Sequence, residues 1–81
     1  MRAIYSARFV RELSAAPKPI QGAFDKQLAF LLRHLRHPSL RAKKFDEARD
    51  IWQERVTGSW RFLFPTTGNL YQLLTIHSRA K

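Results

Sequence analysis

The chain has 81 residues, 44% of them hydrophobic, which is enough for one small core, and we predict a single domain over residues 1–81. The absence of cysteine excludes disulfides and cysteine-ligated zinc. No apolar run is long enough to span a bilayer, and the N-terminus lacks a signal-peptide pattern, so we expect a cytoplasmic protein without a membrane partner. Fifteen Lys and Arg against six Asp and Glu give a net charge of +9, which favours a polyanion or an acidic protein as partner over a charge that serves solubility alone.

The first half of the chain predicts a short strand followed by two helices. Residues 3–7 can form the strand, and Phe9, Val10 and Leu13 predict the apolar side of a helix over residues 8–14. Two prolines break this helix, and the second, Pro19, suits the first turn of a new one. The new helix is expected to end at Pro38 and carries an apolar stripe at three- and four-residue spacing: Ile20, Phe24, Leu28, Leu31, Leu32 and Leu35.

The second half alternates between apolar and polar residues, which predicts three strands. These strands cover residues 50–57, 60–64 and 70–77, with turns at Gly58-Ser59 and at residues 66–69. Pro65 is predicted to close the middle strand. Neither the helices nor the sheet can bury an apolar face alone, so we predict an α+β fold in which the helices cover one face of an antiparallel sheet.

Alternation divides the predicted sheet into an apolar face and a polar face. The apolar face would meet the helices through large side chains: Trp52, Val56, Trp60, Phe62, Phe64, Leu70, Leu74 and Ile76. The polar face gathers the remaining candidates: Gln53, Arg55, Arg61, Tyr71, Thr75 and His77. A β-bulge would change part of this assignment. Each polar residue alone fits an ordinary surface or packing position, whereas the group together indicates a candidate site.

The polar face holds groups that suit RNA cleavage through a 2′-hydroxyl. Arg61 can present a guanidinium to phosphate oxygens, and His77 can protonate the leaving 5′-oxygen. Tyr71 can stack on a base. No carboxylate shares this face, so the acceptor of the 2′-hydroxyl proton stays open: a neutral histidine, a perturbed lysine, or no efficient base.

The segment "HPSLRAKKF", residues 37–45, joins the second helix to the first strand of the meander. Leu40 and Phe45 are expected to anchor it on the core, while three cations face a polyanion: Arg41, Lys43 and Lys44. The alternative is a solvated connector that keeps the protein soluble. His34 and His37 have a spacing that two metal ligands could use, but no third ligand accompanies them, and we predict no metal site.

Three parts of the chain together resemble a known family: the patterned helix, "HPSLRAKKF", and "IWQERVTGSWRFLF" followed by a strand that ends in a histidine. The resemblance is to the RelE/ParE superfamily of toxins from bacterial type II toxin–antitoxin systems, and it extends from "RFVREL" to "LLTIH". It implies an N-terminal helical hairpin on a twisted, three- to four-stranded antiparallel sheet. It also implies a cognate antitoxin as partner.

The resemblance also implies roles for individual residues. Arg61 matches the family's phosphate-stabilising arginine, Arg55 a basic position on the preceding strand, and His77 a C-terminal catalytic histidine. The residues expected to contact nucleic acid are Arg41, Lys43, Lys44, Gln53, Tyr71 and Arg79. This chain departs from some members at Ile51 and Gln53, where those members have lysines, and in the tail after His77, where they have a tyrosine.

Three functions are open on the sequence alone. The first is a ribosome-dependent mRNA endoribonuclease that blocks translation, with Arg61, His77 and Arg55 as its candidate catalytic residues. The second is an inhibitor of DNA gyrase with no chemistry of its own. The third is a degenerate toxin fold that binds nucleic acid or an antitoxin. None of these requires a metal or an organic cofactor.

Overall fold

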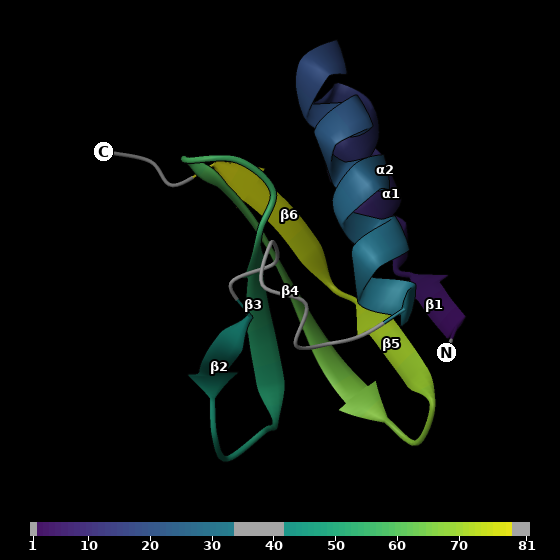
Figure 1. Cartoon of the computed structure of the whole chain (residues 1–81), viewed down its shortest axis with the longest axis vertical. Helices are drawn as coiled ribbons and strands as arrows, with labels where there is room; N and C mark the ends of the chain where they lie inside the picture. Colours follow the sequence, from purple (N-terminus) through teal and green to yellow (C-terminus); the bar gives the residue numbers. More distant parts are fainter. Residues whose placement is uncertain (1, 34–41, 79–81) are drawn as a thin grey trace.

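The computed structural model describes residues 2–33 and 42–78, which form two helices and six strands (Figure 1). Both helices lie on one side of the sheet, so the predicted α+β class is confirmed. No helix within these residues is both long and apolar enough to cross a membrane. The elements in chain order are β1 (Arg2–Tyr5), α1 (Ala7–Ala15), α2 (Lys18–Arg33), β2 (Lys43–Asp46), β3 (Ile51–Arg55), β4 (Trp60–Thr67), β5 (Leu70–Leu73) and β6 (Thr75–Ser78).

The helices begin within one residue of their predicted starts. Ser6 caps α1, because its side-chain oxygen accepts a hydrogen bond of 2.9 Å from the backbone N–H of Phe9. Pro19 lies in the first turn of α2, as expected. Val10 was expected on the apolar side but is 49% exposed, because it lies about 100° around the helix from the buried Phe9. The predicted helix end at Pro38 lies outside the described residues.

Aromatic rings join the helices to the centre of the sheet. The ring of Phe24 on α2 lies 5.2 Å from that of Phe9 on α1 and 5.3 Å from that of Phe62 on β4, measured between centroids. All three side chains are fully buried, and each burial stabilises the fold by roughly 1.5–3 kcal/mol. The helices are therefore fixed to the inner face of β4, whose outer face carries Arg61.

The sheet has six strands and is mixed, which corrects the prediction of three or four antiparallel strands. The order is β1-β5-β4-β3-β2, and β6 pairs with β4 beside β5. The strand near the N-terminus, β1, pairs with β5 in parallel, and every other pair is antiparallel. The segment Lys43–Asp46, expected as a connector, adds the edge strand β2.

The predicted third strand is divided at Leu74, and this division changes which side chains face the core. Thr66 pairs with Tyr71, and Leu63 pairs with Thr75, so the β5–β6 segment has one more residue than the stretch of β4 it opposes. One extra residue reverses the alternation. Leu74, predicted to be in the core, is 36% exposed, while Tyr71 and Thr75, predicted on the polar face, are buried.

The middle strand does not end at Pro65, as predicted, but continues to Thr67. The backbone N–H of Val56 donates to the carbonyl of Trp60 at 2.8 Å. Backbone N–H groups along a strand point alternately to the two sides, so the nitrogen of Pro65 points away from β3. It points to the other edge of β4, where the partner strand changes from β6 to β5. The missing N–H of proline therefore removes no bond from the β3–β4 ladder.

Candidate functional site

Three residues form a row across three neighbouring strands on the outer face of the sheet, opposite the helices. Arg55 of β3 lies directly across from Arg61 of β4, and Arg61 lies directly across from His77 of β6. Arg55 and Arg61 occupy a non-hydrogen-bonded position of their ladder, where opposite Cα atoms approach to about 4.5 Å. Two like charges in that position repel each other, so a bound anion would relieve the repulsion.

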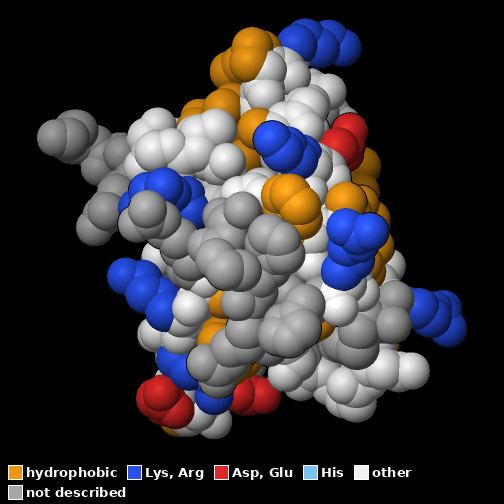
Figure 2. Space-filling view, in the orientation of Figure 1, with side chains coloured by type: hydrophobic (Ala, Val, Ile, Leu, Met, Phe, Trp, Pro, Cys, Tyr) orange, Lys and Arg blue, Asp and Glu red, His pale blue; other side chains and the backbone are white. Residues whose placement is uncertain are grey.

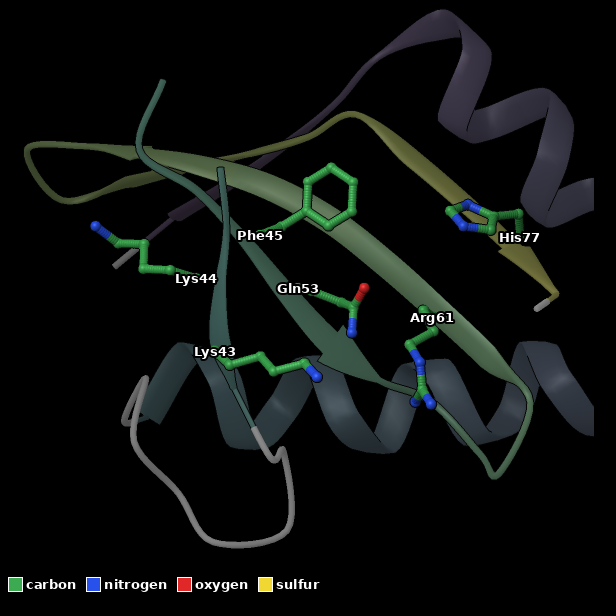
Figure 3. Close-up of a pocket in the computed structure, with 6 residues that line it drawn as sticks. All are labelled: Lys43, Lys44, Phe45, Gln53, Arg61 and His77. Carbon is green, nitrogen blue, oxygen red and sulfur yellow. The ribbon is translucent and has the colours of Figure 1, made fainter. Parts of the chain in front are cut away.

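Two adjoining depressions lie on this face, and Figure 3 shows the residues that line the first of them. The first has a volume of about 270 Å³ and is bordered by Lys43, Lys44, Phe45, Gln53, Arg61 and His77. The second has a volume of about 210 Å³ and is bordered by Lys43, Gln53, Arg55 and Arg61. Lys43, Gln53 and Arg61 belong to both, so the shared wall of the two depressions is polar and basic.

None of the six acidic side chains borders either depression. Three of them lie at the β2–β3 turn, where Asp50 and Glu47 pair with Lys44, and Asp46 pairs with Arg49 at 2.7 Å. Figure 2 shows Lys and Arg side chains along the part of the molecule formed by β2 and β3, with Asp and Glu gathered at that turn. Lys44 is therefore the bordering cation that these carboxylates neutralise, whereas Lys43, Arg55 and Arg61 present their charge to depressions that no acidic side chain borders.

Lys43 and Lys44 take opposite faces of β2. Lys43 pairs with Gln53 and points toward the site, whereas Lys44 pairs with Trp52 and points away from it (Figure 3). The ammonium group of Lys44 lies 2.6 Å from Asp50 and 5.2 Å from the centroid of the Trp52 ring. The hydrogen bond that Lys44 donates to Asp50 is the main reason that the pKa of Lys44 is raised. Lys43 is thus the cation of this pair that faces the site.

Several residues predicted from the sequence meet at this face. The structure brings together Lys43, Gln53, Arg55, Arg61 and His77. Their roles remain predictions, as does that of Lys44. Arg41 and Arg79, together with His34, His37 and Leu40, lie outside the described residues.

Tyr71 does not lie on this face, so the prediction that it stacks on a base is wrong. Its side chain is 2% exposed, and its ring packs edge-on against Phe64 with 5.4 Å between centroids. Burial raises the pKa of the Tyr71 phenol, and the Glu54 carboxyl adds to the rise. The cause of the error is the extra residue between β5 and β6, which turns Tyr71 inward.

Phe45 borders the first depression, a position that was not predicted from the sequence. It was expected to anchor the connector on the core but is 56% exposed. The signal was its spacing of two residues from Lys43, which puts both side chains on one face once residues 43–46 are read as a strand. Within the described residues, no three His, Asp or Glu side chains gather closely enough to hold a metal ion.

The arrangement suits the binding of a phosphate diester on a sheet surface. The guanidinium groups of Arg55 and Arg61 can donate to phosphate oxygens, and Lys43 adds a third positive charge. His77 stands beside Arg61, and its imidazole can donate or accept a proton. Cations can hold a nucleic-acid backbone, and an imidazole is one of the groups that its cleavage requires, beside an acceptor for the 2′-hydroxyl proton.

The fold is that of RelE, of a YoeB/ParE toxin and of YafQ, so the α+β fold that the sequence resemblance implies is confirmed. Its details differ from the expectation, because the strand β1 precedes the two helices and the sheet is mixed and six-stranded. The RelB–RelE antitoxin–toxin complex of Methanococcus jannaschii matches with a TM-score of 0.78 at 16% identity, covering 94% of this chain and 89% of that one. The YoeB/ParE toxin of Agrobacterium tumefaciens matches with 0.80 at 9% identity, covering 96% and 98%. The RelBE2 toxin–antitoxin complex of Mycobacterium tuberculosis matches with 0.78 at 20% identity, covering 96% of each. No family model and no curated protein sequence matches the chain.

Proposed function

We propose that this protein is the toxin of a type II toxin–antitoxin system and that it cleaves mRNA on the ribosome. The observation that carries the proposal is the row Arg55–Arg61–His77 on a basic sheet face free of carboxylates. The likeness of the fold to RelE and YoeB supports it. The antitoxin–toxin complexes among the similar structures support a cognate antitoxin as partner.

In this proposal each residue of the row Arg55–Arg61–His77 has its own role in RNA cleavage. The 2′-oxygen of the RNA attacks phosphorus, the bond to the 5′-oxygen breaks, and a 2′,3′-cyclic phosphate forms. Arg61 stabilises the negative charge that develops on the phosphorane oxygens. His77 donates a proton to the departing 5′-oxygen, and the proton of the 2′-hydroxyl passes to water. Arg55 and Lys43 hold the flanking backbone by charge.

Cell-free translation of a defined mRNA, with primer extension on the stalled ribosomes, tests the proposal. We expect wild-type protein to produce cuts at A-site codons, and both Arg61→Ala and His77→Ala to abolish or strongly reduce them. Arg11→Ala is the control, because like Arg61→Ala it removes one arginine, but from an exposed position on the helical layer. Intact mRNA with wild-type protein, or equal cleavage by Arg61→Ala, contradicts the proposal.

A second candidate is a gyrase inhibitor without chemistry. The absence of any carboxylate from both depressions favours it, because the site then offers no acidic group to accept the 2′-hydroxyl proton. It predicts normal translation, inhibited DNA supercoiling by gyrase, and no effect of His77→Ala on that inhibition. A supercoiling assay with wild type and His77→Ala separates the two functions.

A further inference from the structure

Phe45 is the most exposed large apolar side chain in the described part of the chain. It lies on the edge strand β2, where Lys44 and Asp46 oppose consecutive residues of β3 and leave Phe45 as an extra residue. A bulge of this kind leaves one residue of the strand unpaired in the ladder. The Phe45 ring lies on the sheet face that carries Arg61 and His77 (Figure 3).

Packing against the other described residues does not account for this position. The two tryptophans, Trp52 and Trp60, pack against the hydrophobic core, whereas Phe45 is no part of it. Instead, the ring borders a depression whose other side chains are cationic or polar, with Lys43 and Gln53 beside it. A flat apolar ring next to fixed positive charges is the combination that binds single-stranded nucleic acid, where the charges hold the backbone and the ring stacks on a base.

We propose that Phe45 is a stacking platform for one nucleobase of a single-stranded substrate whose backbone phosphate is held by Lys43 and Arg61. This inference rests on the proposed function in that it assigns nucleic acid to the same face. It adds that the ligand is single-stranded, because a base paired within a duplex keeps its face covered by its neighbours. Stacking on Phe45 tolerates any base, because every base has an aromatic face.

The test measures binding of a fluorescein-labelled 2′-O-methyl oligoadenylate, which cannot be cleaved through a 2′-hydroxyl, by fluorescence anisotropy at low salt. An oligonucleotide of the same length with one internal abasic position is the second probe. The variants are Phe45→Ala, Phe45→Trp, Lys43→Ala and a control, Val10→Ala, which shortens an exposed apolar side chain on α1. Because Phe45 is exposed on an edge strand, its replacement should leave the protein folded.

We expect Phe45→Ala to weaken binding of oligoadenylate by about 5- to 150-fold, the effect of losing one base–aromatic stack. Phe45→Trp should retain the affinity, and Val10→Ala should not change it. The slope of log affinity against log salt should stay the same in Phe45→Ala but decrease by about one in Lys43→Ala. The abasic probe should bind more weakly than oligoadenylate to wild type and lose less affinity than oligoadenylate in Phe45→Ala.

Two results would overturn the inference: equal affinity of wild type and Phe45→Ala for oligoadenylate, or no measurable binding by wild type. Either result would leave the exposed ring as a contact for a protein partner. Binding is measured without ribosomes and without cleavage, so the outcome is separate from that of the translation assay. A wild type that stacks the base on Phe45 but leaves mRNA intact would refute the endoribonuclease and retain the stacking platform.

Discussion

Replacement of Glu54 by glutamine should stabilise the protein at neutral pH. Glu54 is fully buried, and neither of its carboxyl oxygens has a hydrogen-bond partner. Burial raises the pKa of this carboxyl from 4.5 to about 8. The folded protein therefore retains a proton that the unfolded chain releases at neutral pH, and ionisation of the unfolded chain favours unfolding.

The size of the effect follows from the two pKa values. Between pH 4.5 and about 8 the folded state binds one more proton than the unfolded state, so the free energy of unfolding falls as pH rises, by about 1.4 kcal/mol per pH unit. At pH 7 the accumulated loss is about 3 kcal/mol, a large part of the stability of a small domain. Glu54→Gln removes this titration and keeps the shape of the side chain.

Urea unfolding of wild type and Glu54→Gln, followed at several pH values from 4.5 to 8, measures the difference directly. We expect nearly equal stability at the acid end and an advantage of about 3 kcal/mol for Glu54→Gln at pH 7. Glu12→Gln should show the opposite pH dependence, because hydrogen bonds lower the pKa of Glu12. Above the normal pKa of a carboxyl group, wild type should have a higher free energy of unfolding than Glu12→Gln, and it should lose that advantage as pH falls. A difference between Glu54→Gln and wild type that is independent of pH would refute the reasoning.

Three further predictions concern the edge of strand β6, the positive charges of Arg55 and Arg61, and the turn at Gly68. Glu12→Ala should increase hydrogen exchange at the amide of Ile76, because the Glu12 carboxylate accepts that N–H at 3.0 Å on the free edge of β6, and Glu12→Gln should restore part of the protection. Inorganic phosphate should raise the Tm of wild type by binding between Arg55 and Arg61, and Arg55→Gln should reduce this shift; an equal shift in both would count against an anion site. Gly68→Ala should lower the free energy of unfolding in urea by about 1 kcal/mol, because Gly68 has a φ of +61°; an unchanged stability would contradict it.

The sequence predicts the parts of this fold that depend on a regular period. The helical stripe around Phe24 and the alternation of residues 60–64 locate the core correctly, because each side chain's direction follows from its position in a regular element. For the same reason, the placement of Arg55, Arg61 and His77 on one face agrees with the structure. The alternation of side chains within short strands therefore predicted the positions of most residues of the candidate site.

The errors occur where a single residue interrupts the period. The extra residue between β5 and β6 turned Tyr71 inward and Leu74 outward. Phe45 was misplaced for another reason: residues 43–46, expected as a connector, form the edge strand β2, whose alternation puts Phe45 on the outer face with Lys43. A bulge changes the direction of a side chain without a distinct composition of its own, so hydrophobic pattern alone does not reveal it. The parallel pairing of β1 with β5 joins residues far apart in the chain, which local patterns likewise do not specify.

The two faces of β3 are linked through Glu54. This residue points into the core between Gln53 and Arg55, which point to the candidate site. Because its pKa is about 8, Glu54 is neutral at pH 7 and adds no negative charge beneath the arginines of the outer face. Its ionisation would put a carboxylate into the low-dielectric core one side chain away from them and weaken their attraction for phosphate. The burial that destabilises the fold at neutral pH therefore also preserves the positive potential of the site.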